Sequence, residues 1–312
     1  MGPGLRYGAP RVAILGGINL DTFLRVHSLP VPGETTMSSE VLQLLGGKAA
    51  NQAIAVARAG VPVTLLAAVG GDSHGERLRE TLTRTGVDTL SMLRLEHAAT
   101  GRATILVDDH GENVIVVTAG ANGQLSAQDM AAFEPQIAEA AVLVVQNEIQ
   151  PAATIEAIAL AERAGVRCIV NLAPFEDLGE AVSVADPLVV NEIEASQLLG
   201  YSVDAASIRE AATGLMARAR SVVVTLGAYG AFVVNRSGAF THVSAPAASA
   251  VVDTTGAGDA FVGVLAGGIA RGLSLEVAVA RAVDAATASV AVLGAGEKYP
   301  QFDLGLSEAA TS

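Results

Sequence analysis

Short apolar runs alternate with amphipathic stretches along most of the chain. Buried strands are predicted for the apolar runs at 12–15, 63–69, 142–146, 166–170, 188–190 and 221–226. Helices are predicted for the stretches at 47–58, 76–84, 151–163, 205–218 and 259–271. Strands that alternate with helices favour right-handed crossovers, so the pattern predicts an α/β fold with a doubly wound, mostly parallel sheet flanked by helices.

Two stretches, at about 30–45 and 102–118, break this rhythm. The second reads as a hairpin, because the apolar runs 104–107 and 114–117 flank the polar turn 108–111. We expect the two stretches to pair into a small β-sheet lid inserted in a single domain that spans residues 1–312. The exposed apolar face of such a lid needs cover, which favours a homodimer formed through the lid.

The composition sets limits on the partners. Of the 312 residues 51% are hydrophobic and 16% are charged, which permits a large core. The net charge of −13 argues against nucleic acid and anionic membranes, and no apolar run reaches the ~20 residues of a membrane span. A phosphate ligand would need backbone N–H groups or a cation. The single cysteine, Cys168, lies in an apolar run, which predicts a buried structural thiol and a cytoplasmic location.

The segment from Asp253 to Asp259, Asp-Thr-Thr-Gly-Ala-Gly-Asp, precedes an apolar helix. The amides of Gly256, Ala257 and Gly258 would lie at the helix N-terminus, where they can hold an anion. Asp259 would place a carboxylate beside them. An anion hole next to a carboxylate base is what phosphoryl transfer to an alcohol requires. The alternative is that Asp259 merely caps the helix after a glycine turn.

Other glycine-rich nucleotide motifs do not fit this chain. A dinucleotide fingerprint would need a third glycine where Phe261 stands, and it would follow the first strand rather than lie near the C-terminus. The Walker motif Gly-x4-Gly-Lys-Ser/Thr does not occur in the sequence, so a P-loop enzyme is excluded.

Two pairs of polar residues lie in the N-terminal part of the sequence. Lys48 and Asn51 lie three residues apart at the start of a predicted helix, after the glycine pair 46–47, and so share one face. Asn19 and Asp21 lie two apart in extended chain and face the same way. An amide and a carboxylate on one side suit vicinal hydroxyls, although solvated lysines, caps and turns use the same residues.

Two further strand ends carry candidate nucleotide contacts. Asn191 could contact phosphate, and Glu194 could hold a magnesium ion through water, although both also fit an ordinary helix cap. Thr225 is followed by Leu226 and Gly227, and the glycine would leave room for a nucleotide. These sites fall at the C-terminal ends of predicted strands, where open α/β sheets bind their ligands.

The motifs GGKAANQA (46–53) and DTTGAGDAF (253–261) resemble the two signatures of the PfkB/ribokinase family of carbohydrate kinases. The segments GGINLD, TAGAN, NEIE and TLG resemble its ribokinase branch. The resemblance covers nearly the whole chain and implies a ribokinase-like α/β core with a β lid. It also implies transfer of phosphate from ATP to a small sugar, with ribose as the expected acceptor, aided by Mg²⁺ and K⁺.

The resemblance also implies residue roles. The expected sugar ligands are Asn19, Asp21, Gly47, Lys48, Asn51 and Glu148, with Asp259 as base and Gly256, Ala257 and Gly258 as anion hole. The expected nucleotide site contains Asn191, Glu194, Thr225, Gly227, Gly230 and Gly258, with Glu194 holding magnesium through water. The expected potassium site contains Asp253, Thr255, Ala291, Gly294 and Gly296.

Arg102 and the stretch 293–297 depart from the family pattern, the latter in its side chains at the expected potassium site, and several functions compete. Arg102 stands where a small apolar residue is usual near the sugar; it could meet an acidic group or a base, or simply lie on the lid surface. The rival functions are a sister kinase for fructose, deoxyribose, a 2-keto-3-deoxy sugar acid or a nucleoside, a nicotinamide oxidoreductase, and a non-catalytic sugar-binding protein. The missing dinucleotide fingerprint disfavours the second, and the presence of Asp259 disfavours the third.

Overall fold

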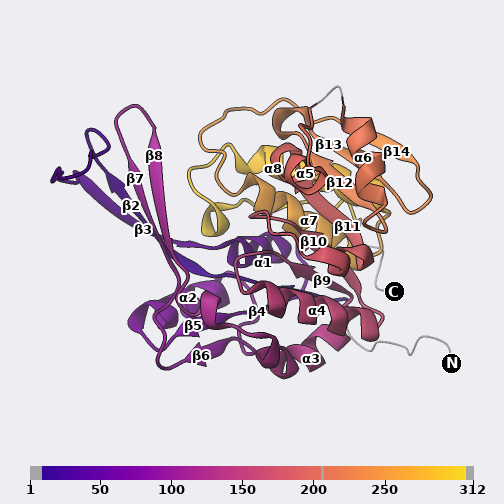
Figure 1. The fold of residues 1–312 in the computed structure, drawn as a ribbon, viewed down its shortest axis with the longest axis horizontal. Helices are drawn as coiled ribbons and strands as arrows, with labels where there is room; N and C mark the ends of the chain where they lie inside the picture. The colour runs from indigo at the N-terminus through magenta and orange to yellow at the C-terminus, as the bar shows by residue number, and fades with distance from the viewer. Residues whose placement is uncertain (1–8, 205–206, 307–312) are drawn as a thin grey trace.

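The computed structural model describes residues 9–204 and 207–306, which form an α/β core and a projecting β-sheet (Figure 1). In the described part of the chain the core sheet has the strand order β14-β13-β12-β11-β10-β9-β1-β4. The strands from β4 to β12 in this order pair in parallel, and β13 and β14 are antiparallel. The predicted doubly wound, mostly parallel sheet is therefore confirmed.

The strands of the core sheet are β1 (Val12–Leu15), β4 (Val63–Leu66), β9 (Val142–Val145), β10 (Arg167–Asn171), β11 (Ala185–Asn191), β12 (Val222–Thr225), β13 (Ala231–Val234) and β14 (Phe240–Val243). The remaining strands are β2 (Asn19–Arg25), β3 (Glu40–Gly46), β5 (Ala68–Gly70), β6 (Leu93–Leu95), β7 (Arg102–Val107) and β8 (Asn113–Thr118). The α-helices are α1 (Lys48–Arg58), α2 (Ser73–Arg84), α3 (Met130–Glu139), α4 (Pro151–Arg163), α5 (Glu192–Leu199), α6 (Ile208–Met216), α7 (Ala257–Ala270) and α8 (Leu275–Ser289).

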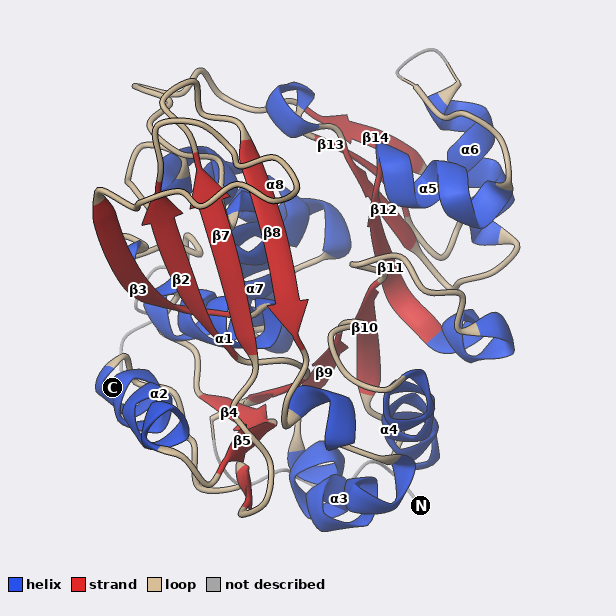
Figure 2. Ribbon diagram, turned by 60° about the vertical axis from the view of Figure 1, so that its left-hand side comes forward, coloured by secondary structure: helices blue, strands red, loops and turns tan. Residues whose placement is uncertain are grey.

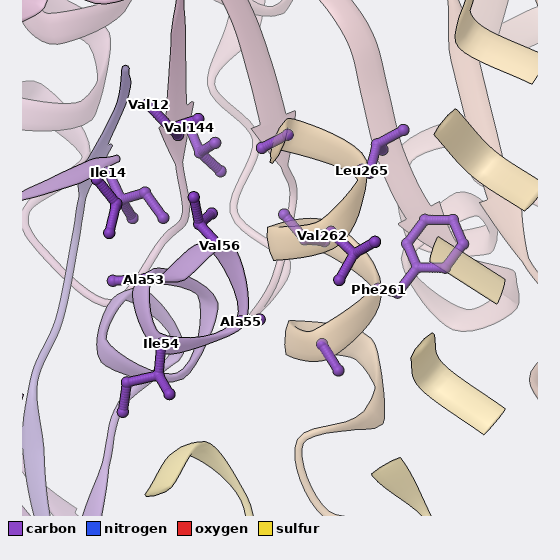
Figure 3. Close-up of a cluster of buried hydrophobic side chains, with 14 of the residues drawn as sticks. Val12, Ile14, Ala53, Ile54, Ala55, Val56, Val144, Phe261, Val262 and Leu265 are labelled. Atoms are coloured by element: carbon purple, nitrogen blue, oxygen red, sulfur yellow. The ribbon is translucent and has the colours of Figure 1, made fainter. Parts of the chain in front are cut away.

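Helices cover both faces of the core sheet because its strands are apolar on both sides. Along β1, Val12 and Ile14 face the cluster that includes α1, α2, α7 and α8. Ala13 and Leu15 face the cluster that includes α3, α4, α5 and α6. Figure 3 shows Val56 of α1 near Val144 of the sheet, with Val262 of α7 beside them. This packing holds the start of α1 next to the start of α7.

The second sheet is the lid, and its strand order is β3-β2-β7-β8. It rises from the core at the left of Figure 1 and is seen face-on in Figure 2. Residues 40–46 and the hairpin 102–118 both belong to it, and β2 lies between them and pairs with both. Since β2 begins at Asn19, the chain passes from β1 straight into the lid.

Several elements differ from the sequence-based expectations. The run 63–69, expected as one strand, is divided at Ala67, because β5 leaves the core sheet to pair with β6. Helices α3 and α8 and strands β13 and β14 were not predicted. The helix expected over 205–218 is α6, which begins at Ile208; residues 205–206 lie outside the described part. Among the described helices, none has the length and apolar character needed to cross a membrane.

The core sheet has a topological switch point beside β1. The chain goes from β1 to β4 on one side, and later sections add β9, β10, β11 and β12 in turn on the other. At such a point the connections diverge, and a crevice opens at the C-terminal ends of the strands. The segments that follow β1 and β9 carry Asn19, Asp21 and Glu148.

Candidate active site

Two cavities lie close together, one next to the lid and the other at the C-terminal ends of β10, β11 and β12. The first lies between the lid and the segment after α8, and its polar lining consists of Asp21, Arg25, Glu40, Asn51, Asp253 and Thr255. The second is lined by Lys48, Asn171, Ala173, Val189, Val190, Asn191, Glu194, Thr225, Gly256, Gly258, Asp259, Phe261 and Val262. Most of the predicted site residues therefore line one of two neighbouring cavities.

Asp259 lies where the two cavities approach each other. It is in the first turn of α7 and is only 7% exposed. Its Oδ2 accepts a hydrogen bond from Asn51 Nδ2 at 3.0 Å, and its Oδ1 accepts one from Gln52 Nε2 at 3.1 Å. Asn51 lines the first cavity and Asp259 the second, so their hydrogen bond joins the two.

The glycine turn before Asp259 requires glycine at its centre. Gly256 is the N-cap of α7 and has φ of 76°, in the left-handed region that other residues avoid. A side chain at 256 would also overlap Ala295 and the hydroxyl of Tyr299, which donates a hydrogen bond to the Gly256 carbonyl. No side chain caps this helix, and Gly256 and Gly258 line the second cavity; the Ala257 N–H instead donates to the Thr254 carbonyl.

Lys48 lines the second cavity, and Glu148, which lines neither cavity, is bonded to its backbone. The backbone N–H of Lys48, at the N-terminus of α1, donates to Glu148 Oε2 at 2.7 Å. Burial raises the pKa of Glu148 to about 7, although Lys48 opposes the shift. The negative charge of Asp259 raises the pKa of Lys48, so this side chain stays positive beside the carboxylate. Gly47 supplies the turn before α1, with φ of 90°.

Asn19 and Asp21 come from the start of β2. The Oδ1 atom of Asn19 accepts a hydrogen bond from Asn122 Nδ2 at 3.0 Å, which leaves the amide nitrogen of Asn19 for another partner. Asp21 Oδ1 is buried and lacks a hydrogen-bond partner within residues 9–204 and 207–306. Burial and the nearby Asp259 raise the pKa of Asp21 to about 7. An unpaired buried oxygen of this kind costs free energy unless a ligand supplies a donor.

The predicted nucleotide residues lie on the far side of Asp259. Asn191 and Glu194 form a reciprocal cap at the start of α5, with N–H···O distances of 2.8 and 2.9 Å, and both also line the second cavity. Asn191 and Glu194 therefore cap the helix, as the alternative interpretation predicted, and also line the cavity. Thr225 lines the same cavity, whereas Gly227 and Gly230 form the following turn outside its lining.

The predicted potassium residues lie together behind the glycine turn. The Asp253 carboxylate accepts hydrogen bonds from the N–H groups of Thr255 and Gly294, each at 2.9 Å. Burial would raise the pKa of Asp253, but these hydrogen bonds outweigh it and hold the pKa below its usual value. Gly296 lies against Asn51, and the Asp253 N–H donates to the carbonyl of Val290, next to Ala291.

Arg102 does not line either cavity. Its register partner in β2 is Leu20, whereas Asp21 is opposite Ala103, so Arg102 and Asp21 point to opposite faces of the lid. The guanidinium of Arg102 lies 3.6 Å from the carboxylate of Asp72 on the outer side and is 45% exposed. This position fits the prediction that Arg102 is a surface charge of the lid. The acidic group next to Arg102 is Asp72 of the protein itself.

Sequence reasoning missed five polar residues that support the site. They are Gln52, Asn122, Gln146, Asn171 and Tyr299. Gln146 and Asn171 stand at the C-terminal ends of β9 and β10, so the rule that ligand sites form at strand ends could have found them. Gln52 lies within the quoted motif 46–53, but its spacing from Asn51 gave no sign that both amides reach one carboxylate.

Known proteins share this architecture and these motifs. Residues 9–301 match the family described as pfkB family carbohydrate kinase. The chain belongs to the pfkB family of carbohydrate kinases. A mouse (Mus musculus) ribokinase is 37% identical to this family member over 299 residues, covering 94% of the chain and 92% of the relative. A Schizosaccharomyces pombe ribokinase is 34% identical over 306 residues, with 93% and 95% covered.

Solved structures agree with the assignment to the pfkB family. The structure of Arabidopsis thaliana ribokinase complexed with ribose and ATP superposes with a TM-score of 0.87 at 28% sequence identity. The superposition covers 96% of this pfkB-family chain and 97% of the plant protein. The family expected from the motifs 46–53 and 253–261 is thus confirmed.

Proposed function

We propose that this chain transfers the γ-phosphoryl group of ATP to the 5-hydroxyl of D-ribose, giving ribose 5-phosphate. The observation that carries the proposal is the place of Asp259, whose carboxylate is held by Asn51 between a cavity lined by Asp21 and a cavity lined by Asn191 and Thr225. A sugar in the first cavity and a nucleotide in the second would meet at this carboxylate. The family and its ribokinase relatives support ribose as acceptor.

The sugar would be oriented by the polar groups of the first cavity and its surroundings. Asn19, Asp21, Gly47, Lys48, Asn51 and Glu148 supply carboxylate, amide and ammonium groups of both hydrogen-bonding types. The free oxygen of Asp21 would accept from a sugar hydroxyl, and the free amide nitrogen of Asn19 would donate to one. Binding a hydroxyl in this way would satisfy the Asp21 oxygen, which is otherwise buried without a partner in the described part of the chain.

Asp259 would act as the general base, and the turn before it would act as the anion hole. The carboxylate takes the proton of the 5-hydroxyl while the hydroxyl oxygen attacks the γ-phosphorus. The bond between the γ-phosphorus and the oxygen that leaves with ADP breaks at the same time. The amides of Gly256 and Gly258, which line the second cavity, and the positive charge of Lys48 would stabilise the charge on the moving phosphoryl group. The Ala257 amide would join them only by giving up its hydrogen bond to the Thr254 carbonyl. Closure of the lid would exclude water and so limit ATP hydrolysis.

The nucleotide and the cations would take the remaining predicted positions. Asn191, Glu194, Thr225, Gly227 and Gly230 would hold ATP, and the carboxylate of Glu194 offers an oxygen acceptor that suits hydrated Mg²⁺. The carboxylate of Asp253, with Thr255 and the carbonyls of Ala291, Gly294 and Gly296, is an all-oxygen set that suits K⁺. The cations, when bound, supply positive charge next to the transferring phosphate.

We extend the proposal to a homodimer formed through the lid, in the cytoplasm. Strand β8 is exposed along its whole length, and its apolar residues Val114, Ile115, Val116 and Val117 are 48–62% exposed. Apolar side chains on an edge strand favour cover by a second chain. Sedimentation should give a dimer mass, and Ile115→Asp should shift it toward the monomer. A monomeric wild type would reject the dimer. The buried Cys168 suits a reducing compartment.

A sugar panel tests the proposed reaction. ADP release would be measured with D-ribose, 2-deoxyribose, fructose, a 2-keto-3-deoxy sugar acid and a nucleoside, each with and without K⁺. We expect the highest kcat/KM with ribose, and a higher rate with K⁺ than without it. A higher kcat/KM with another acceptor would replace ribose by that acceptor, and sugar binding without ADP release would indicate a binding protein.

A further inference from the structure

Three buried amide side chains form a hydrogen-bonded group next to Asp259. Gln52 and Gln146 are fully buried, and Asn171 is 7% exposed. They come from three separate elements, since Gln52 is in α1, Gln146 follows β9 and Asn171 ends β10. Buried amides are costly unless they are hydrogen-bonded, so their arrangement requires an explanation.

Their hydrogen bonds form a chain with one direction. Gln52 Nε2 donates to Asp259 Oδ1 at 3.1 Å and to Asn171 Oδ1 at 3.0 Å. Gln146 Nε2 donates to Gln52 Oε1 at 2.6 Å. A carboxylate can only accept, so the nitrogen of Gln52 must face Asp259 and its oxygen must face Gln146. The Asp259 carboxylate and the donor at Gln146 therefore select the same orientation of the Gln52 amide, while Gln146 Oε1 has no partner in the described part of the chain.

We propose that Gln52 is a positioning residue for the base Asp259 and that Gln146 orients Gln52 for this purpose. The inference rests on the proposed function of Asp259. Asn51 holds one carboxylate oxygen and Gln52 the other, so the plane of the carboxylate is fixed from both sides. Asp259 itself lines the second cavity, so the carboxylate held in this way is still open to a ligand there.

The position of Gln52 separates this role from substrate binding. Asn51 lines the first cavity, but neither Gln52 nor Gln146 lines the first or the second cavity. A residue that contacts only the base should change the rate of the chemical step and leave the affinity for both substrates nearly unchanged. A displacement of the base by about 1 Å can lower a rate about 100-fold.

The test is a double-mutant cycle between positions 52 and 259. Gln52→Met keeps the length of the side chain and removes its three amide hydrogen bonds, to Asp259, Asn171 and Gln146. We expect kcat to fall about 10–100-fold, with KM for the sugar and for ATP changed less than about threefold. In an Asp259→Ala background the same substitution should cause no further loss, because the base that it positions is absent.

A matched control lies one helical turn away. Val56 is fully buried on α1 but belongs to the apolar core. Val56→Ala should lower Tm and leave kcat within about twofold, since it loses packing only. Gln146→Met should lower kcat less than Gln52→Met, because it acts one hydrogen bond further away; it also serves as the test if Gln52→Met fails to fold.

The outcomes separate the inference from the proposed function. Wild-type kcat in Gln52→Met, or in Gln146→Met where it replaces that variant, would overturn the positioning role. The same fold-loss with and without Asp259 would also overturn it, because it would indicate a general structural role. The proposed function is tested separately by the activity of the wild type in the sugar panel. If the wild type is active and Gln52→Met is unaffected, only the positioning role is wrong. If the wild type is inactive, both the positioning role and the proposed function are wrong.

Discussion

Asp186, which is buried, and Asp21, which is partly buried, are carboxylates near opposite ends of the core strands. Asp186 lies near the start of β11 and is 1% exposed; its oxygens accept hydrogen bonds from Ser221 and Arg236, and Arg167 Nε lies 2.8 Å away. Burial would raise the pKa of Asp186, but these partners outweigh it and hold the pKa below its usual value. Asp21 follows the C-terminal end of β1 and keeps an oxygen without a partner in the described part of the chain.

The Asp186 carboxylate stabilises the fold, whereas the Asp21 carboxylate has an oxygen that can accept a hydrogen bond from a ligand. Both oxygens of Asp186 accept hydrogen bonds from side chains of the protein itself. Around Asp21, burial raises the pKa of Asp21 and Glu148 to about 7, and the charge of Asp259 adds to both shifts; Lys48 interacts with Glu148 and Asp259. Such clustering lowers the stability of the empty protein and is typical of functional sites. Substitutions at the two ends should therefore have opposite consequences.

The largest effect is expected at Asp259. Asp259→Asn keeps the shape of the side chain but removes the base, so kcat should fall about 10²–10⁴-fold. Sugar affinity, measured by calorimetry, should be partly retained, because Asn19, Asp21 and Lys48 remain. Thermal unfolding should change little, because the gain from removing a charge in a crowded acidic site is opposed by the loss of one of the two hydrogen bonds that Asn51 and Gln52 donate. Near-normal turnover in Asp259→Asn would reject the assignment of the base.

The second effect should appear in stability alone. Asp186→Ala leaves the charges of Arg167 and Arg236 unpaired, and their side chains are 31% and 64% exposed. Because water can reach both, we expect the free energy of unfolding to fall by about 2–3 kcal/mol, less than for a fully buried pair. Urea unfolding would measure this, and kcat/KM per folded molecule should not change.

Arg236→Ala is the matched control for this second prediction. It removes the most exposed partner and leaves Asp186 bound by Arg167 and Ser221, so the loss should be about 1 kcal/mol or less. If Asp186→Ala were as stable as the wild type, or if it lowered kcat as Asp259→Asn does, the contrast between the two ends of the sheet would be wrong.

The same contrast explains how far the sequence could be interpreted. The parallel core strands and the helix from Pro151 to Arg163 were predictable, because apolar runs, an initial proline and a terminal glycine are local signals, whereas the antiparallel strands β13 and β14 were not predicted. The turn at 253–259 and the segment 46–53 were predictable for the same reason, although the roles of their residues remain predictions. Helix α8 was not predicted, and β2 was not recognised as the strand that joins the two lid segments.

The arrangements that depend on distant residues could not be predicted. The hydrogen bonds from Gln52 to Asp259 and from Gln146 to Gln52 join residues 207 and 94 positions apart. The cluster around Asp186 joins residues from different strands in the same way. In both cases each residue alone looks like an ordinary polar residue near a strand, and only the sheet order brings them together.

The smallest predicted effect is the pH dependence of the empty protein. The pKa of Asp21 rises from its ordinary value of 3.8 to about 7 in the fold, so between these pH values the folded state binds more protons than the unfolded state. Stability should therefore fall as pH rises from about 4 to about 7 and level off above. Asp21→Asn resembles the protonated form and should raise the free energy of unfolding at pH 8 by about 1–2 kcal/mol, with little change at pH 4.

Unfolding curves of the wild type and of Asp21→Asn at several pH values would measure this effect. Part of the slope should persist in Asp21→Asn, because Glu148 titrates in the same window. A variant less stable than the wild type at pH 8 would mean that the Asp21 carboxylate stabilises the empty fold, as Asp186 does.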